Sequence, residues 1–238
     1  MLKTTNLCFT YPDGKQAINN INIELNNNET VGLIGANGAG KTTFLHTLVG
    51  LYLPSEGAVE VDGIQLSKKN LEKIRSKVAY LFQNSDDQLF MNTIYEDVAF
   101  GPRSQGLSET EVETITKEAL TKVNMLTLMN ARPYRLSSGQ KKSAAIASLL
   151  SMRPKLLIMD EPTNSLDPKQ RRNLITLLNG FDEAKLIATH DLDFVLDTCE
   201  RVLIMKDGKL VADGKAVELL SNTDLMEECS LEVPYRLQ

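Results

Sequence analysis

The sequence lacks tryptophan altogether, and it has only two histidines and three cysteines in its 238 positions. Cys8, Cys199 and Cys229 lie far apart and form no Cys-x-x-Cys pair. Neither a disulfide framework nor a zinc site is expected from this spacing. Buried thiols in a reducing cytoplasm are the favoured interpretation.

Long apolar runs are also missing. A membrane-spanning helix needs about 18 or more successive apolar residues, whereas Leu156–Met159 and Val202–Met205 have the length of buried strands. The N-terminus has no apolar segment after a basic start, so a secretory signal is not expected. The formal net charge of -5 leaves no strong basic footprint, and no nucleic-acid partner is expected.

The N-terminal part of the sequence is rich in strand patterns. Strand patterns cover residues 2–11, 17–25 and 30–34, and a hairpin covers 58–66 with its turn at Asp62-Gly63. Another strand is expected over residues 77–83, which ends at Gln83.

From about residue 84 to 151 the sequence pattern instead predicts helices. Residues 109–123 carry apolar side chains at the spacing of an amphipathic helix. Strands and helices alternate again from residue 152, which predicts a mostly parallel sheet with helices on its faces. A closing hairpin is expected to turn at Asp207-Gly208. We therefore expect one domain over 1–238, with a β-rich front and core at about 1–83 and 152–238 and a helical subdomain at about 84–151.

A glycine-rich loop stands between the strand 30–34 and a helix expected over 42–50. Residues 35–43 read GANGAGKTT and match G-x-x-x-x-G-K-[ST] in the required strand–loop–helix frame. The glycines let backbone N–H groups close around phosphate, and the helix N-terminus favours negative charge. Lys41 is expected to reach the β- and γ-phosphates, and the Thr42 hydroxyl to ligate Mg²⁺. The nucleotide contacts expected along this loop are Asn37, Gly38, Ala39, Gly40, Lys41, Thr42 and Thr43.

An acidic pair follows the apolar strand 155–159. Parallel strands deliver their carboxyl ends to the edge of the sheet where ligands bind, so Asp160 is expected in the Mg²⁺ shell. Successive strand residues face opposite ways, which leaves Glu161 free to face the γ-phosphate and polarise a water molecule. An ordinary Asp-Glu at a strand end is the alternative. The catalytic interpretation is favoured because the pair comes downstream of a phosphate loop.

The pentapeptide Leu136-Ser137-Ser138-Gly139-Gln140 heads an expected helix. Taken alone, it is explained by helix N-capping. Together with the loop and the acidic pair, it resembles the LSGGQ signature of the ATP-binding cassette (ABC) ATPases. Further motifs stand in that family's order: Tyr11 for the aromatic that stacks on adenine, Gln83 for the Q-loop glutamine, Asp160-Glu161-Pro162-Thr163 for the Walker B end, Ser165-Leu166-Asp167 for the D-loop and His190 for the switch histidine.

The resemblance implies an α/β fold, an ABC-type P-loop NTPase. Its parts are a RecA-like parallel-sheet core, an N-terminal antiparallel β subdomain and an inserted α-helical subdomain. It implies ATP and Mg²⁺ as cofactors, and two cassettes that face head to tail around each ATP. Ser137 and the Gly139 backbone then contact the γ-phosphate of the partner's nucleotide, and Gln140 and Asp167 are further nucleotide-binding residues. The catalytic set is Glu161, His190, Lys41 and Gln83, and the metal set is Thr42, Gln83 and Asp160.

Two positions depart from the family pattern. Ser138 replaces the usual first glycine of the Gly-Gly pair, and Ser143 stands where many relatives have arginine. Gly139, which permits close backbone approach, is retained. An active site is therefore expected, while the effect of the two serines on its rate stays open.

The segment Tyr80–Phe90 and the segment Glu96–Pro102 look like those of energy-coupling factor importers, of the cobalt/nickel CbiO type or its vitamin-transporting cousins. This resemblance implies a peripheral protein on the cytoplasmic side of the cell membrane, with membrane subunits docking near Gln83–Phe90. Asp86-Asp87 is then part of a coupling surface, not a metal site. The transported substrate stays open, as does an identical or paralogous partner cassette. A regulatory ABC ATPase without a transporter and a small-molecule P-loop kinase remain as alternatives.

Overall fold

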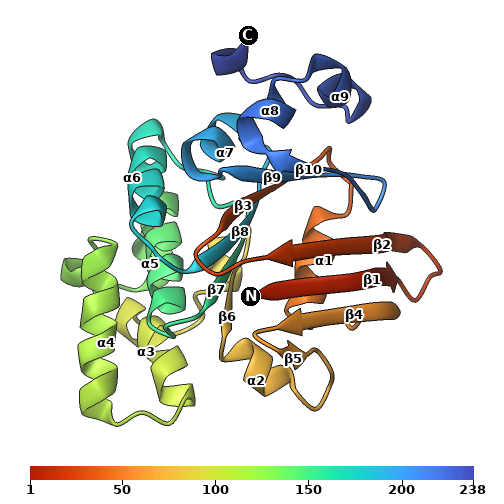
Figure 1. Ribbon diagram of the computed structural model, residues 1–238. Coiled ribbons are helices and arrows are strands. Elements are labelled where there is room, and N and C mark those ends of the chain that lie inside the picture. Colours follow the sequence, from red (N-terminus) through yellow and green to blue (C-terminus); the bar gives the residue numbers. More distant parts are fainter.

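The computed structural model describes residues 1–238, which form two sheets and a helical side (Figure 1). The strands are β1 (Leu2–Thr10), β2 (Gln16–Leu25), β3 (Thr30–Ile34), β4 (Glu56–Val61), β5 (Ile64–Gln65), β6 (Val78–Leu81), β7 (Leu156–Asp160), β8 (Ala184–Ala188), β9 (Arg201–Lys206) and β10 (Lys209–Lys215). The helices are α1 (Lys41–Leu48), α2 (Leu71–Arg75), α3 (Ile94–Ser104), α4 (Glu109–Lys122), α5 (Ser138–Leu150), α6 (Pro168–Asn179), α7 (Leu192–Thr198), α8 (Ala216–Leu220) and α9 (Thr223–Glu228).

The larger sheet has the order β10-β9-β3-β8-β7-β6, and all its pairs are parallel except β9 with β10. Both of its faces are covered, as a parallel sheet requires. In β7, Leu156 and Ile158 join the cluster that includes residues of α1, whereas Leu157 and Met159 join the cluster that includes residues of α5. The predicted parallel sheet with helices on its faces is confirmed.

The smaller sheet is antiparallel, with the order β2-β1-β4-β5. Its hairpin turns at Asp62 (φ 50°) and Gly63 (φ 76°). The hairpin of β9 and β10 turns in the same way at Asp207 (φ 48°) and Gly208 (φ 74°). Positive φ at both central residues matches the right-handed twist of the strands, which is why Asp-Gly is favoured there. Both turns lie where the sequence predicts them.

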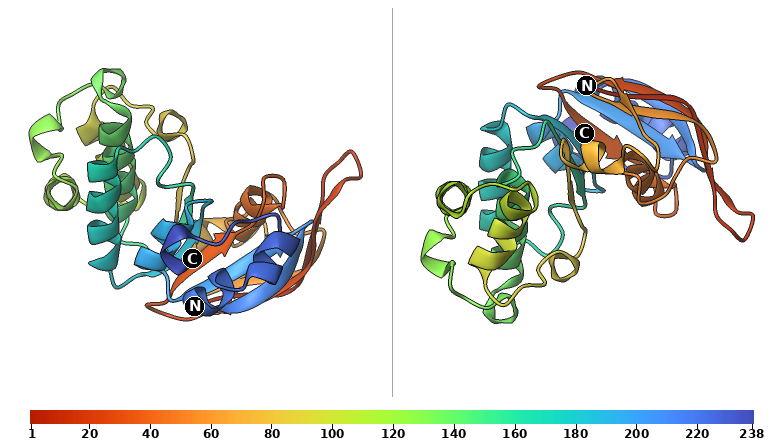
Figure 2. Two further views of the ribbon diagram at one scale, coloured as in Figure 1. Left: turned by 90° about the horizontal axis from the view of Figure 1, so that it is seen from above. Right: turned by 90° about the horizontal axis from the view of Figure 1, so that it is seen from below.

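Helices α3, α4 and α5 pack on one another and stand on the side away from the smaller sheet (Figure 2). The apolar stripe predicted on 109–123 is buried, with Val112, Ile115, Ala119 and Leu120 in the interior. Capping boxes fix the starts of α3 and α4, where Thr93 and Ser108 accept from the backbone N–H groups of Glu96 and Glu111.

Some expectations were wrong in detail. β6 ends at Leu81, so Gln83 lies in a loop and does not end a strand. The next backbone groups bind side chains instead of a neighbouring strand: Phe82 N donates to Gln88 Oε1 at 3.4 Å, and Gln83 O accepts from Lys142 Nζ at 2.9 Å. Cys8 is partly exposed, unlike the two other thiols.

Each helix is too short or too polar to cross a membrane.

Candidate nucleotide site

The glycine-rich loop connects the end of β3 to the start of α1. Gly40, with φ 102°, precedes the helix in a left-handed conformation that a side chain disfavours, and a Cβ there would lie 2.8 Å from the carbonyl oxygen of Ala17. Ala39, within the loop, is buried, and its carbonyl oxygen accepts a hydrogen bond from Gly208 N at 3.0 Å. The loop is thus held between β2 and the β9–β10 turn.

Lys41 is buried, and its Nζ donates to the loop carbonyls of Gly35 at 2.6 Å and Ala36 at 3.3 Å. Burial lowers the pKa of Lys41, and the nearby charges of Glu161 and Asp160 oppose that shift. Two carboxylates therefore favour a charged ammonium at the mouth of the loop.

Asp160 ends β7 and is 2% exposed. Burial raises the pKa of this carboxyl, and hydrogen bonds from Thr42 and Tyr80 act in the opposite direction. The Tyr80 hydroxyl lies 3.3 Å from Asp160 Oδ2. Burial also raises the pKa of Tyr80, so its hydroxyl keeps the proton that it donates.

Thr42, Gln83 and Asp160 line one cleft and offer a hydroxyl, an amide oxygen and a carboxylate. Mg²⁺ prefers such hard oxygen ligands, and it commonly uses one or two carboxylates together with substrate phosphates. The donor set fits Mg²⁺. The chain has no group of three or more His, Cys, Asp or Glu residues suited to a metal ion.

Glu161 follows the last residue of β7 and has φ 48°, a left-handed backbone conformation. Its Oε2 lies 2.8 Å from His190 Nδ1 and 3.2 Å from Thr189 Oγ1. His190 is largely exposed, whereas Glu161 is buried. The two carboxylates have different partners, since Asp160 pairs with Tyr80 and Glu161 with Thr189 and His190.

The cleft has a volume of about 550 Å³. Predicted residues that line it are Tyr11, Asn37, Gly38, Gly40, Lys41, Thr42, Thr43, Gln83, Asp160 and Glu161. The Tyr11 hydroxyl lies 2.7 Å from Thr43 Oγ1, and its ring packs edge-on against Phe9 and Tyr52. The structure therefore gathers predicted residues from four segments that are distant in sequence.

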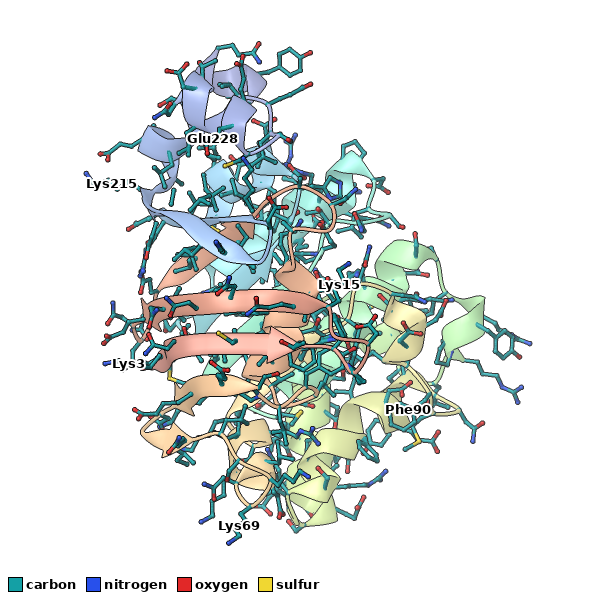
Figure 3. All side chains as sticks on the ribbon, turned by 90° about the vertical axis from the view of Figure 1, so that its right-hand side faces the viewer. Lys3, Lys15, Lys69, Phe90, Lys215 and Glu228 are labelled. Atoms are coloured by element: carbon teal, nitrogen blue, oxygen red, sulfur yellow. The ribbon has the colours of Figure 1, made fainter.

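Sequence reasoning missed further lining residues, namely Lys15, Gln16, Ala17, Asp207 and Gly208. Lys15 lies at the turn between β1 and β2 (Figure 3), directly after the Tyr11–Gly14 segment. Its position next to the predicted nucleotide contact Tyr11 was the sequence signal that could have identified Lys15. The sequence identified Asp207-Gly208 only as a hairpin turn, because no neighbouring residue in the sequence links this turn to the phosphate loop.

The signature residues lie outside this cleft, at the start of α5. The Ser137 hydroxyl accepts from Gln140 N at 3.3 Å, and Gln140 Oε1 accepts from Ser137 N at 3.0 Å. Asp167 and Gln170 form the same capping box at the start of α6. The capping interpretation of Ser137 therefore holds in this chain, whatever further contacts the residue makes.

Tight packing joins these two helix starts. A Cβ on Gly139 would lie 2.2 Å from the amide carbon of Gln170. Ser138 Oγ donates to the carbonyl oxygen of Ser165 at 3.0 Å. Ser143 lines a small cavity of about 110 Å³ between α5 and α6. The signature and the D-loop thus touch within one chain.

A phosphate loop that lines one cleft with the acidic end of a parallel strand, at the carboxyl edge of the sheet, defines a P-loop nucleoside triphosphatase. Within that class the chain belongs to the ABC transporter family, whose sequence pattern matches residues 18–164.

Similar proteins agree with this assignment. The putative ABC transporter ATP-binding protein GSU1281 of Geobacter sulfurreducens is 42% identical over 238 residues, which cover 100% of this chain and 96% of that protein. The energy-coupling factor transporter ATP-binding protein EcfA of Methanosphaera stadtmanae is 41% identical, over 99% of this chain and 86% of its own length.

Solved structures give the same result. CbiO1 of Clostridium perfringens, described as part of the ABC transporter complex cbiONQ, superposes with a TM-score of 0.85 at 34% identity, over 95% of this chain and 93% of CbiO1. The cassette MJ0796, solved as a dimer bound to ADP and Pi, gives a TM-score of 0.82 at 30% identity, over 91% of this chain and 99% of that one. This chain is an ATP-binding subunit of an ABC transporter and a transport-coupled ATPase, of the type that includes EcfA and CbiO.

Proposed function

We propose that this chain hydrolyses ATP for an energy-coupling factor importer of cobalt or nickel ions. The structural likeness to CbiO1 supports this choice among ABC transporters. The single observation that carries the catalytic part is the gathering of Lys41, Asp160 and Glu161 in one cleft, with His190 in contact with Glu161.

In the proposed reaction, Lys41 and the loop N–H groups bind the ATP phosphates, and Tyr11 supports the adenine ring. Thr42, Asp160 and Gln83 hold Mg²⁺, which neutralises charge on the phosphate oxygens when bound. Glu161 accepts the proton of the attacking water. His190, when protonated at Nδ1, donates to Glu161 Oε2 and fixes the orientation of that carboxylate.

The active form that we propose is a dimer of cassettes. Ser137, Gly139, Gln140 and Asp167 stand outside the chain's own cleft, which supports their assignment to the nucleotide of a second subunit. The N-terminus of α5, where the helix dipole favours negative charge, suits a phosphate of that nucleotide. The similar cassette MJ0796 was solved as a dimer bound to ADP and Pi. An identical partner and a paralogous one both fit this geometry.

Membrane subunits are proposed to dock beside the Gln83–Phe90 loop, on the cytoplasmic side of the cell membrane. Phe90 and Phe100 are 64% and 47% exposed, and their rings meet edge to face at 5.2 Å. Phe90 lies at the surface on the side of α3 (Figure 3). An exposed aromatic pair of this kind favours contact with another protein. In this proposal residues 84–151 act as the helical subdomain that carries the docking surface.

The cargo is tested by uptake. Cells that carry Lys41→Ala are compared with wild type for accumulation of labelled cobalt, nickel and vitamins, with the exposed Lys69→Ala as the matched control. Loss of metal-ion uptake alone supports the proposal. Loss of vitamin uptake alone identifies the vitamin-importing alternative, and unchanged uptake of all substrates favours a regulatory ATPase.

Docking is tested by co-purification with membranes. The double variant Phe90→Ala/Phe100→Ala is expected to leave the membrane fraction. Tyr235→Ala removes an aromatic that is 86% exposed at a distant site, and it should stay bound. Equal retention of both variants contradicts the proposed surface.

A further inference from the structure

Lys142 is a buried lysine that the proposed reaction does not use. It lies in the second turn of α5 and is 3% exposed. Its Nζ donates to the carbonyl oxygen of Gln83 at 2.9 Å. An ammonium group is costly to bury unless hydrogen bonds and opposite charges compensate it. A buried lysine with a specific backbone acceptor therefore calls for a functional explanation.

The charge of Lys142 is compensated from the nucleotide site. Burial lowers its pKa to about 8, and the negative charges of Asp160 and Glu161 oppose that shift. The ammonium group thus stands between α5 and the acidic end of β7.

The loop after β6 is bound to α5 at several further points. Lys141 Nζ lies 2.6 Å from Asp86 Oδ1. Gln88 Nε2 donates to Ala145 O at 2.9 Å and to Ser148 Oγ at 3.0 Å. Since the sheet pairing of this strand has ended before the loop begins, these side chains attach the loop to the helix and not to the sheet.

We propose that Lys142 is a positioning residue that ties the backbone of Gln83 to the signature helix. A displacement of the first turn of α5, which carries Ser137 and Gly139, then moves Gln83 relative to Asp160 in the cleft. Binding of the partner's nucleotide to the signature thereby changes the position of Gln83 relative to the other metal-binding side chains of this chain. This inference rests on the proposed roles of Gln83 and of the signature.

The chemistry favours lysine at this position. The carbonyl oxygen of Gln83 accepts a hydrogen bond from a charged donor, which is stronger than one from a neutral donor. The aliphatic stem of Lys142 is buried, so methionine retains a similar apolar volume there without the charge. Lys141 pairs with the same loop, but through the side chain of Asp86 and at the surface. It therefore provides a matched control.

The test combines kinetics with amide hydrogen exchange. Lys142→Met is expected to lower kcat for ATP by about 10- to 100-fold, the range typical of residues that orient a ligand, while KM stays near the wild-type value. Exchange of the amides of residues 83–88 is expected to speed up in the same variant. Lys141→Met should keep the wild-type kcat. Lys142→Gln retains a donor, and it should recover part of both kcat and protection.

Wild-type exchange of residues 83–88 in Lys142→Met overturns the inference, as does a raised KM with unchanged kcat. If Lys142→Met does not fold, Lys142→Gln is compared with wild type. A fall in both kcat and the amide protection of residues 83–88 supports the inference, and a change in only one of them overturns it. The exchange measurement needs neither transport nor turnover. A failure of the proposed cargo or reaction is therefore distinguishable from a failure of this inference.

Discussion

Glu161 Oε2 lies 2.8 Å from His190 Nδ1, although the two residues are 29 positions apart. They meet because β7 and β8 are parallel neighbours, with Asp160 opposite Ala188 in the register. Each residue follows the carboxyl end of its strand. A one-residue slip of that pairing would separate the two side chains.

Glu161→Gln is expected to retain ATP binding and to reduce steady-state hydrolysis by at least about 100-fold, in line with the loss of a general base. The amide keeps the shape of the side chain but cannot accept the proton. ATP-bound dimers should accumulate and be seen by size-exclusion chromatography. Near-normal phosphate release would overturn the assigned base. Glu232→Gln, at an exposed position, is the control.

Tyr80→Phe is expected to weaken the binding of Mn²⁺, used as a spectroscopic substitute for Mg²⁺, by up to about ten-fold in the presence of ATP. The change removes the hydrogen bond that orients Asp160. Electron paramagnetic resonance of free Mn²⁺ measures the affinity. Tyr52→Phe removes a hydroxyl from the same aromatic cluster and should leave the affinity unchanged. Equal affinities in the two variants would contradict this role.

Ser138→Gly, which restores the common family residue, is expected to speed amide exchange over residues 164–166. The reason is the loss of the hydrogen bond from Ser138 Oγ to Ser165 O. Ser138→Ala should have the same effect if the hydroxyl is responsible. The free energy of unfolding should change by no more than about 1 kcal/mol, since an exposed hydrogen bond contributes little. Unchanged exchange in both variants would show that the contact is not formed in solution.

Gly139→Ala is expected to destabilise the protein by about 1 kcal/mol or more, because the new methyl group displaces Gln170 and breaks the capping box of α6. Urea unfolding measures the change. In the double variant with Gln170→Ala, the two losses should be less than additive. Full additivity would mean that the side chain of Gln170 does not occupy this space. Gly180→Ala, where a Cβ meets no atom closer than 3.4 Å, is the control.

Asp62→Asn tests an ion cluster on the smaller sheet. Hydrogen bonds from Lys77 and Lys155 lower the pKa of Asp62 to about 2. The folded pKa lies below the value of about 3.9 for an unfolded chain, so the stabilisation is present above about pH 4 and lost as the pH falls toward 2.

The difference in urea midpoint between wild type and Asp62→Asn should therefore be constant above about pH 5 and shrink below about pH 4. The exposed Asp224→Asn provides the comparison. A difference that does not change with pH would show that the charge of Asp62 is not the cause.

Features that depend only on neighbouring residues could be predicted from the amino-acid sequence. The phosphate loop, the acidic pair at the end of β7, the Asp-Gly turns and the stripe of α4 each follow from local backbone preferences or a short period. For that reason the strand–helix alternation and the cleft residues of the phosphate loop and the acidic pair could be named in advance. Tyr11 and Gln83 were named only through the family resemblance, and five further lining residues were missed. Local pattern also misled at Gln83, where apolar spacing extends past the point at which the sheet pairing stops.

Only the tertiary structure decided which distant groups meet. The contact of Glu161 with His190 depends on strand order, and that of Lys142 with Gln83 depends on how α5 packs beside β6. The space beneath Gly139 depends on α6. No period in the sequence encodes these pairings, because each joins elements whose relative positions are set by burial of the two shared cores.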